Sequence, residues 1–396
     1  MSLSGELMKK LLIVNNNMKV GGVQKSLYNF LWATEKHYDI TLLLFACKGA
    51  YMDKLPPGIK ILECKSLFRY LGVSQGECKG SLSDALTRGF LAVICRFFGR
   101  PVVMRLLLAS QKMLPESYDC AISFLHNGRR RAFYGGVQEF VLHRVKAIKK
   151  VAFLHCDYRS CGADFRGNNR SLSKFDAIAP CSDGCRRVFL EVLPAFEERC
   201  NTVKNFHRFE EIQALAEEDP VCYEECRFNV LMVSRLSHEK GVERAIKAIA
   251  CAIELRVPVT LHIVGSGAME EALHSLVDEL GILEYVKFYG EHDNPYRFMK
   301  NADLFLLTSY HEAAPLVIEE AQYLKLPILT VNTTSSEDMV KKTGAGWVCD
   351  NSQSAIDRAL VDILSNADAL GHVKEHLQKQ QMDNALALSQ LKLMVD

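Results

Sequence analysis

"KKLLIVNNNMKVGGVQKSLYNFLWATEK", Lys9 to Lys36, decides the architecture of the first half of the chain. An apolar run ends at Asn15, a polar loop leads to Gly21 and Gly22, and an amphipathic segment follows. This order predicts a strand, a glycine loop and a helix, the repeating unit of a parallel sheet wrapped in helices. At the two glycines the backbone can come close to phosphate groups, and a plain turn is the alternative.

Further apolar runs repeat the alternation along the chain. In the first half they are DITLLLF, IKILEC, DCAISFL, KKVAFLH, DAIAPCS and NTVKN, and after a polar, acidic interval they are FNVLMVS, VTLHIVG, VKFYG, ADLFLLTS, PILTV and GWVCD. We predict an α/β chain with two doubly wound, Rossmann-like domains facing across a cleft. The predicted domains are residues 1–205 and 206–376, and a C-terminal helix in 377–396 is expected to pack back on the first domain.

The composition is that of an ordinary globular protein, with 396 residues, 48% hydrophobic and 24% charged. No apolar run approaches the ~18 residues of a membrane span. Residues 1–7, MSLSGEL, lack the pattern of a secretory leader and are predicted to be an appended leader, with Met8 as the natural start. Fourteen cysteines without ordered spacing indicate reduced thiols in the cytosol. The C-x3-C pairs at Cys181/Cys185 and Cys222/Cys226 are interpreted as structural cysteines rather than zinc ligands.

Charge is divided unevenly between the halves. Residues 1–205 carry 31 Lys and Arg against 17 Asp and Glu, whereas residues 206–396 carry 17 against 30. A basic half suits an anionic partner. The segment Arg88 to Leu114 mixes basic and apolar residues, which fits either a core helix pair, favoured by its position, or a surface resting on anionic lipid. The basic GRRRAF, residues 128–133, could attract the pyrophosphate of a lipid-linked acceptor.

The loops that follow the strands of the second half carry the informative residues, since ligands of such sheets bind at the carboxyl ends of the strands. Arg235 and Lys240 follow the first of these strands and are the cations that a buried diphosphate needs. An ordinary loop with solvated charges is the alternative for either residue alone. Gly265, in VGSG, follows the next strand.

A short helix, residues 315–325, follows a later strand. Pro315 is predicted as its first residue, and the N–H groups of Leu316 and Val317 offer a phosphate site. Glu320 falls on the apolar arc, whereas Glu319, Gln322 and Lys325 are predicted to lie on the wet face. A core-facing carboxylate needs a partner, because its burial costs several kcal/mol. Glu320 can accept both hydroxyls of a ribose, and Glu312 is placed nearer to a sugar.

Several segments together resemble the retaining family 4 glycosyltransferases of GT-B fold, bacterial enzymes that build capsules, O-antigens and other surface glycans. They are GGVQKSLYNFL, VSRLSHEKGVERAIKAI, LHIVGSGAMEEAL and VKFYGEHDNPYRFMKNADLFLLTSYHEAAPLVIEEAQYLKLPILT. The resemblance covers nearly the whole second domain and, more weakly, the first. Its most specific feature is the E-x7-E pair, Glu312 and Glu320.

The resemblance implies a role for each site residue. Arg235 and Lys240 would bind the donor diphosphate, and Glu312 the transferred sugar. His126 and His155 follow first-domain strands where the family often carries a histidine facing the donor sugar; structural histidines are the alternative, and His155 ranks first. The predicted catalytic residues are Glu312, Arg235, Lys240 and His155, and the predicted donor-binding residues are Gly21, Gly22, His126, Gly265, Tyr289, Gly290, Ser309, Leu316, Val317 and Glu320. The segment Tyr289 to His292 would border the nucleobase, mainly through its backbone.

The expected reaction is hexosyl transfer from a nucleotide sugar, with UDP favoured, to a glycan or a polyprenyl-diphosphate-linked saccharide. The sequence lacks an Asp-x-Asp motif, so we expect no metal and no cofactor, and the cations would stabilise the leaving group. Same-face attack is favoured over double displacement through Glu312. Ala313 stands where the family commonly has glycine, which leaves the donor identity open.

The expected location is the cytoplasm, with peripheral association at the inner face of the cytoplasmic membrane. Two alternatives keep the same nucleotide site: a GT-B epimerase of nucleotide sugars and a non-catalytic nucleotide-sugar-binding protein. A dehydrogenase fits less well, because the glycines at 265 and 267 lack a third at the required offset. A nucleic-acid partner is not expected, since it would leave Glu320 unexplained.

Overall fold

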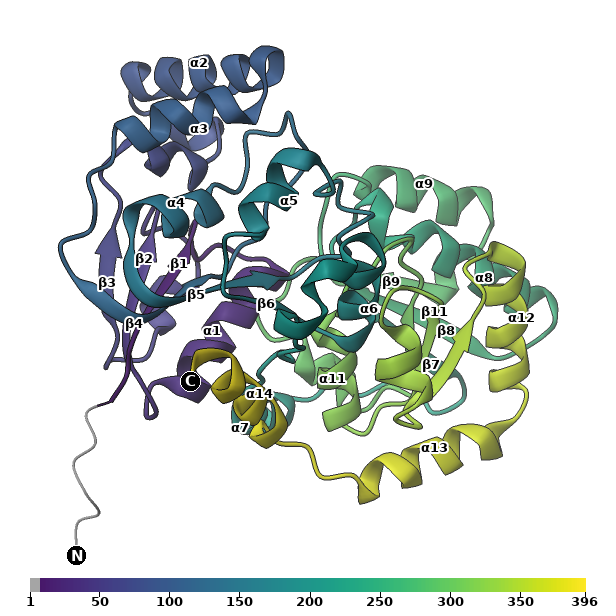
Figure 1. Cartoon of the computed structure of the whole chain (residues 1–396). Coiled ribbons are helices and arrows are strands. Elements are labelled where there is room, and N and C mark those ends of the chain that lie inside the picture. The colour runs from purple at the N-terminus through teal and green to yellow at the C-terminus, as the bar shows by residue number, and fades with distance from the viewer. Residues whose placement is uncertain (1–7) are drawn as a thin grey trace, which may run out of the picture. The chain divides into compact units, whose positions relative to one another are not determined.

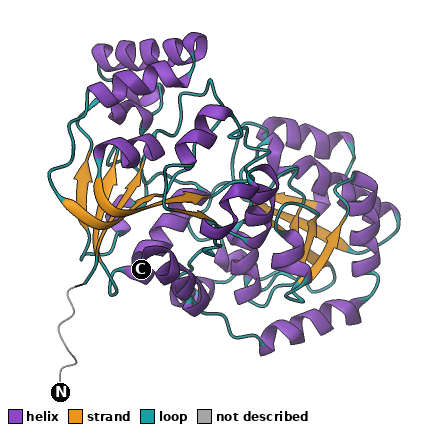
Figure 2. Ribbon diagram, viewed as in Figure 1, coloured by secondary structure: helices purple, strands orange, loops and turns teal. Residues whose placement is uncertain are grey.

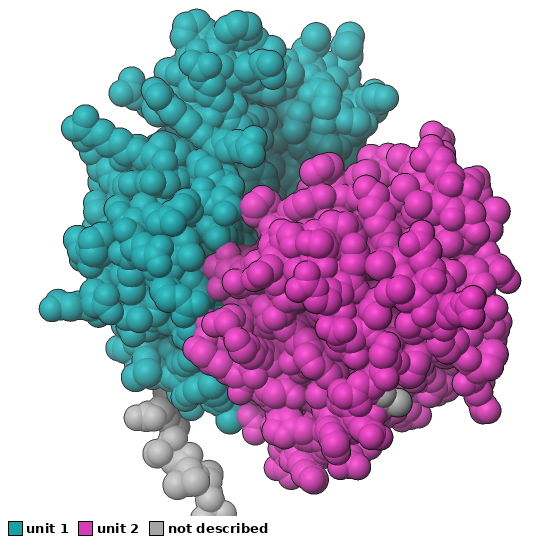
Figure 3. All heavy atoms as spheres, turned by 90° about the vertical axis from the view of Figure 1, so that its right-hand side faces the viewer, with its two compact units in different colours: residues 1–207, 384–396 teal, residues 208–383 magenta. Residues whose placement is uncertain are grey.

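The computed structural model describes residues 8–396 and divides the chain into two compact units. Unit 1 comprises the described residues up to His207 together with Asn384–Asp396, and unit 2 is Arg208–Asp383 (Figure 3). Each unit holds one parallel sheet of six strands between layers of helices (Figure 2). The predicted α/β class with two doubly wound sheets is therefore confirmed. The leader predicted at residues 1–7 lies outside the described residues.

The sheet of unit 1 has the strand order β3-β2-β1-β4-β5-β6, with every neighbouring pair parallel. Parallel strands between two helical layers are buried on both faces, which explains their continuous apolar runs. The strands are β1 (Lys10–Asn15), β2 (Asp39–Leu44), β3 (Lys60–Glu63), β4 (Ser117–Ser123), β5 (Lys146–Leu154) and β6 (Ala177–Pro180).

Alternate side chains of these strands serve two separate cores. Leu11 and Ile13 point into the core that α1 and α14 cover, whereas Leu12 and Val14 point into the core on the other face. The period of two is that of any strand. The helices of unit 1 (Figure 1) are α1 (Gly22–Thr34), α2 (Leu82–Phe98), α3 (Arg100–Ala109), α4 (Val137–Arg144), α5 (Arg166–Leu172), α6 (Asp183–Val192) and α14 (Ala385–Val395).

The strand predicted at NTVKN, residues 201–205, is wrong. The segment runs beside β6 and makes isolated backbone hydrogen bonds, from Asn201 N to Ile178 O at 3.1 Å and from Val203 N to Pro180 O at 2.9 Å. Pro180 has no N–H to donate back, so the ladder cannot continue. Val203 is nevertheless buried in the core under α1, and this burial accounts for its apolar character.

Helices α2 and α3 lie side by side away from the sheet (Figure 1) and show which interpretation of residues 88–114 holds. The core interpretation is right for one face only, on which Leu91, Cys95 and Val103 are buried. The opposite face of α2 exposes an apolar stripe at helical spacing, which we call the outer stripe: Leu82, Leu86, Phe90, Val93 and Phe97, exposed by 53–77%. Within residues 8–396, none of the helices combines the length and apolar character that a membrane crossing requires.

The sheet of unit 2 has the order β12-β11-β10-β7-β8-β9 and is also parallel throughout. Its strands are β7 (Phe228–Val233), β8 (Val259–Val264), β9 (Val286–Phe288), β10 (Leu304–Leu307), β11 (Ile328–Val331) and β12 (Gly346–Cys349). One face packs against α8 (Val242–Glu254), α9 (Glu270–Glu279) and α12 (Gln353–Leu364). The other packs against α7 (Phe209–Glu217), α10 (Tyr296–Met299), α11 (Leu316–Tyr323) and α13 (Ala367–Lys379).

Helix α11 begins one residue later and ends earlier than predicted, with Pro315 as its N-cap. The predicted place of Glu320 on the core-facing arc is confirmed, since its side chain is 2% exposed. Gln322 was placed on the wet face, and this is wrong. It is 3% exposed and donates through Nε2 to the carbonyl of Met339, because the segment Glu337–Lys341 packs over that side of the helix.

The two sheets share one topology. In each, the first strand lies beside the second on one side and the fourth on the other, so the strand order reverses between β1 and β4 in unit 1 and between β7 and β10 in unit 2. Ligands of open parallel sheets bind outside the carboxyl ends of the strands at such a point. The loops after these four strands are therefore the places to examine for function.

Candidate functional site

Three residues of the predicted site meet where the strand order of unit 2 reverses. Lys240 follows β7, and Ser309 and Glu312 follow β10. The Lys240 Nζ atom lies 2.6 Å from Glu312 Oε1, and the Ser309 hydroxyl donates to the same oxygen at 2.8 Å. The side chains of Lys240 and Glu312 are only 20% and 10% exposed. This is an ion pair shielded from bulk water, where charges act more strongly than at an open surface.

Backbone contacts hold the two loops together. The N–H of Tyr310 donates to the carbonyl of Glu239 at 2.9 Å, and the Thr308 hydroxyl donates to the carbonyl of Gly241 at 2.7 Å. Gly241 has φ +60°, and a Cβ there would lie 2.4 Å from the Thr308 oxygen. Only glycine fits this position without strain, so the approach of Lys240 to Glu312 depends on it.

Arg235 stands apart from this pair. Its side chain is 70% exposed and pairs with Glu239 at 2.8 Å within its own loop. An exposed ion pair of this kind contributes little to stability. Arg235 can therefore exchange Glu239 for an anionic ligand at small cost.

The ends of β8 and β9 are joined by two of the predicted glycines. The N–H of Gly265 donates to the carbonyl of Gly290 at 2.7 Å, and a Cβ on Gly265 would lie 1.9 Å from the carbonyl oxygen of Ser234. The phenol of Tyr289 points into the unit and lies 3.0 Å from Nδ1 of His262. The side chain of Tyr289 is thus used for packing, and its backbone N–H donates to the carbonyl of Ile263 at 2.9 Å.

Helix α11 presents its first turn at the same end of the sheet as Lys240. Leu316 is 8% exposed and Val317 is half-buried. Ser335 donates to the carbonyl of Ala313 and so anchors the loop before the helix. Glu320, one turn further along, is held inside the core on this helix. The site in unit 2 thus combines Lys240 and Glu312, both from strand-end loops, with the N-terminus of α11, and Glu320 lies within that helix.

In unit 1, Gly21 is the N-cap of α1 and Gly22 its first residue. A Cβ on Gly22 would meet no atom within 4 Å, so space remains above the start of this helix. The amide of Gln24 lies 3.3 Å from the side-chain oxygens of Asn16 and Asn17 in the loop before it. Side-chain amides therefore hold this loop, together with the ion pair of Lys19 with Glu77.

His126 and His155 follow β4 and β5 and differ from the charged groups of unit 2. Burial lowers the pKa of His126 to about 4 and, with a smaller contribution from His126, that of His155 to about 3. The buried His126 Nδ1 and His155 Nε2 atoms have no hydrogen-bond partner. The His155 ring also packs on Phe124, with the ring centres 4.6 Å apart. Both imidazoles are neutral near pH 7, so they can hydrogen-bond a sugar hydroxyl but cannot supply a positive charge.

The structure therefore divides the predicted site into two groups. Lys240, Ser309 and Glu312 touch one another in unit 2, and His126 and His155 lie near each other in unit 1. Sequence reasoning missed Cys156 and Cys161, which lie beside His126. Their C-x4-C spacing and the distant histidine gave no recognisable motif. Gly241 was missed as well, although a glycine after a lysine at the start of a helix was a usable signal.

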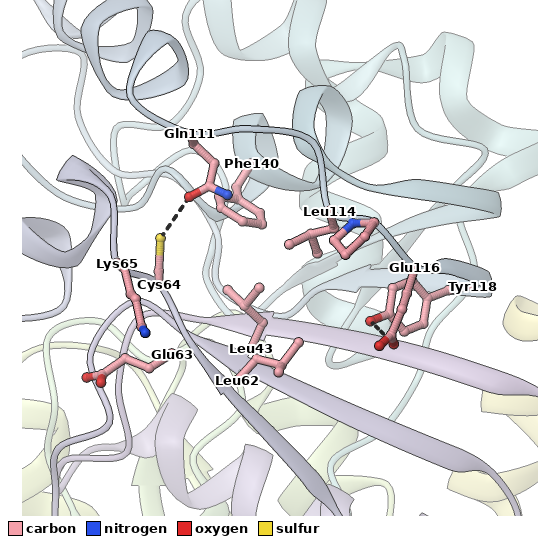
Figure 4. Close-up of a pocket in the computed structure, with 11 residues that line it drawn as sticks. Leu43, Leu62, Glu63, Cys64, Lys65, Gln111, Leu114, Glu116, Tyr118 and Phe140 are labelled. Atoms are coloured by element: carbon pink, nitrogen blue, oxygen red, sulfur yellow. Dashed lines mark hydrogen bonds between the residues drawn. The ribbon is translucent and has the colours of Figure 1, made fainter.

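Two hollows accompany these groups. One of about 480 Å³ in unit 2 is lined by Glu218, Asp219, Asp293 and Arg297, with Glu291 and His292 from the segment predicted to border a nucleobase. One of about 330 Å³ in unit 1 has an apolar wall that includes Leu43, Leu62, Leu114 and Phe140, with Cys64 beside Gln111 (Figure 4). None of the predicted site residues lines this second hollow.

The fold is that of the GT-B glycosyltransferases. The crystal structure of HepE from Anabaena in complex with UDP matches with a TM-score of 0.66 and 18% identity, over 98% of this chain and 99% of that one. At this identity the likeness establishes the fold alone.

Residues 224–380, which contain the site of unit 2, match the family model described as glycosyl transferases group 1. WaaG of Escherichia coli K12, a lipopolysaccharide glucosyltransferase, is 33% identical over 110 residues, 28% of this chain and 29% of WaaG. An N-acetylgalactosaminyltransferase of Campylobacter jejuni, named for a diphospho-undecaprenol-linked acceptor, is 28% identical over 148 residues, 37% of this chain and 39% of that enzyme. The matches thus span about a third of these relatives' lengths.

Proposed function

We propose that the chain is a retaining glycosyltransferase of family 4 that moves a hexosyl group from a UDP-sugar to a glycan or lipid-linked saccharide. The observation that carries the proposal is the shielded contact of Lys240 with Glu312 at the reversal point of the second sheet. The match of residues 224–380 to the glycosyltransferase model covers both residues. The UDP in the neighbouring HepE structure supports UDP as the nucleotide.

In the proposed reaction Lys240 and Arg235 bind the donor diphosphate and stabilise the charge that grows on it as the glycosidic bond breaks. Glu312 accepts two hydrogen bonds on one oxygen. Such a carboxylate is better suited to hold sugar hydroxyls than to attack the anomeric carbon. We therefore favour attack of the acceptor on the face that the leaving phosphate departs from, with the phosphate accepting the acceptor's proton. Glu320 binds the ribose, and neutral His155 and His126 bind hydroxyls of the donor sugar.

A screen of UDP-, GDP- and ADP-sugars by thermal shift, followed by transfer to lipid-linked saccharides, tests this proposal. We expect stabilisation by a UDP-sugar and acceptor-dependent release of UDP. A donor that is converted to its epimer without any acceptor would instead identify an epimerase. Donor binding with neither conversion nor transfer would identify a binding protein.

We further propose that unit 1 binds the anionic inner face of the cytoplasmic membrane, where a lipid-linked acceptor is presented. Support comes from the outer stripe of α2, with Phe90 and Phe97 exposed by 64% and 70%, and from the exposed Arg96 of the same helix. Aromatic side chains next to cations are typical of surfaces that lie in a lipid interface. WaaG and the C. jejuni enzyme, by their names, also act on lipid-bound glycans.

Co-sedimentation with vesicles of anionic lipid tests the surface. The double variant Phe90→Gln/Phe97→Gln should lose most of the binding, whereas Leu393→Gln, at an equally exposed leucine of α14, should keep it. Added salt should weaken binding, because the arginine contribution is screened. Binding that resists both salt and the double variant would contradict this surface.

A further inference from the structure

Two thiols and an imidazole converge at the carboxyl edge of the first sheet. His126 follows β4, Cys156 follows β5, and Cys161 lies at the end of the next turn. One ligand atom from each of these side chains lies within 4.8 Å of the other two. The two Sγ atoms are 3.2 Å apart. Among the residues that the structure describes, this is the one such group of histidine, cysteine or acidic side chains.

The turn between the cysteines fixes their approach. The Asp157 carboxylate accepts the backbone N–H groups of Arg159 at 3.0 Å and Ser160 at 2.8 Å. The Cys161 N–H then donates to the carbonyl of Asp157 at 3.0 Å and closes one helical turn. This turn returns Cys161 to Cys156, so the pair of thiols is a product of local backbone geometry rather than of chance side-chain rotamers.

The donor set has the chemistry of a soft metal site. Zinc and related ions prefer thiolates and imidazoles, and sites open to a further ligand use three protein side chains. The buried Nδ1 of His126 has no hydrogen-bond partner, and Cys156 is 7% exposed. Two thiolates on one zinc ion lie about 3.7 Å apart, so the thiols need to separate by only about half an ångström.

We propose that His126, Cys156 and Cys161 bind a thiophilic divalent transition-metal ion, zinc first, with a fourth position left for water. Each thiol gives its proton to solvent as its sulfur bonds to the metal, and the imidazole binds through a neutral nitrogen. The site is independent of the diphosphate-binding lysine in unit 2. It is distinct from a metal acting in sugar transfer, which the sequence does not call for.

Titration of the full-length, reduced protein with Co²⁺ tests the site directly. The titration uses the Cys222→Ser/Cys226→Ser background, which removes the exposed C-x3-C pair as a competing site. We expect one equivalent of Co²⁺ to give thiolate-to-cobalt charge-transfer absorption that zinc abolishes. Replacing either ligand thiol, as Cys156→Ser or Cys161→Ser, should weaken binding by at least about 100-fold.

Circular dichroism and thermal melting provide the folding control, and Cys161→Ser is the safer variant because Cys161 is only half-buried. Absence of the band in the background protein would overturn the proposal. So would an unchanged band in folded Cys161→Ser. Formation of a Cys156–Cys161 disulfide under air that blocks Co²⁺, with recovery on reduction, would support the assignment of the two ligands.

One consequence rests on the proposed function, in which His126 contacts the donor sugar. Zinc should then slow sugar transfer by the background protein, while Cys161→Ser should keep its rate in the same zinc concentration. Metal binding with no effect on sugar transfer would contradict the proposed contact of His126 with the donor sugar, while the metal site would still be supported. Absence of cobalt binding with normal sugar transfer would overturn the metal site and leave the proposed function intact.

Discussion

The two strand-reversal points of this chain have the same topology and different chemistry. Between β7 and β10 lies a shielded lysine–glutamate pair, whereas the imidazoles at the ends of β4 and β5 are neutral and the arginines of the β4 loop, residues 129–131, are exposed. A diphosphate leaving group gains negative charge, and a sugar does not. In the proposed function, Lys240 in unit 2 binds the nucleotide diphosphate, and the neutral imidazoles of unit 1 bind sugar hydroxyls. The shared topology therefore fixes where a site lies in each sheet, while the loop residues decide which chemical groups that site can hold.

The largest expected effect tests the Lys240–Glu312 pair of unit 2. Lys240→Ala should lower the rate of transfer by roughly 100- to 1000-fold, because one stabilising cation is removed from the developing charge. Lys247→Ala, at an exposed lysine of the next helix, is the matched control and should leave the rate unchanged. Turnover of UDP-sugar by Lys240→Ala at the wild-type rate would remove the lysine from the mechanism.

The second prediction compares a glycine from each unit. Gly265→Ala should lower the free energy of unfolding by about 2–4 kcal/mol, because φ is +141° and the new Cβ would meet the Ser234 carbonyl oxygen at 1.9 Å. Gly22→Ala has open space and should change stability by less than about 0.5 kcal/mol. Denaturant unfolding of both variants measures the difference. A Gly265→Ala protein as stable as Gly22→Ala would mean that the backbone at the end of β8 tolerates a side chain.

The third prediction concerns the buried carboxylate. Glu320→Gln should weaken UDP binding about 10-fold, because a neutral amide accepts hydrogen bonds from ribose less strongly than a carboxylate does. Glu319→Gln, the neighbouring residue on the less buried side of α11, serves as control. Calorimetric titration with UDP gives both affinities. A Glu320→Gln protein of higher stability and unchanged affinity would show that the ribose binds elsewhere.

The smallest expected effect tests the buried imidazole of His155 in unit 1. The folded state holds His155 with a pKa of about 3, below its ordinary value of 6.5, so the unfolded chain takes up the proton first. The stabilisation is complete above pH 6.5 and is lost as the pH falls toward 3. At pH 5 the free energy of unfolding should therefore be roughly 1–2 kcal/mol lower than at pH 7. His155→Gln should flatten the fall of melting temperature between pH 7 and pH 5, and an unaltered slope would contradict this origin.

The sequence was sufficient to predict the sheets because parallel strands are continuous apolar runs between turn residues. It failed at NTVKN because burial of Val203 looks the same whether or not a ladder forms beside Pro180. It failed at Gln322 because a helical wheel cannot show the segment that covers that side of α11. The sequence of residues 88–114 fits either a core or a lipid-facing interpretation for the same reason, since periodicity gives the number of apolar faces but not what lies against each.

The candidate site was predictable where its residues directly follow strands. Lys240 and Glu312 are 72 positions apart, and the rule that ligands bind at the carboxyl ends of parallel strands places both at one edge of the sheet. Cys156 and Cys161 are brought together by a turn that the Asp157 carboxylate caps, a local detail that no apolar pattern records. The lowered pKa values of His126 and His155 come mainly from burial, which the sequence places only approximately.

Helix α14 has a consequence for how this protein is made. Its Leu391, Met394 and Val395 complete the same core of unit 1 as Leu11 and Ile13 of the first strand. Helix α1 covers part of that face, but unit 1 can complete its burial only after all of unit 2 has emerged from the ribosome. Until residues 385–395 have been synthesised, the nascent first unit exposes apolar surface and is expected to bind chaperones. A chain that terminates before α14 keeps that surface exposed and is expected to aggregate.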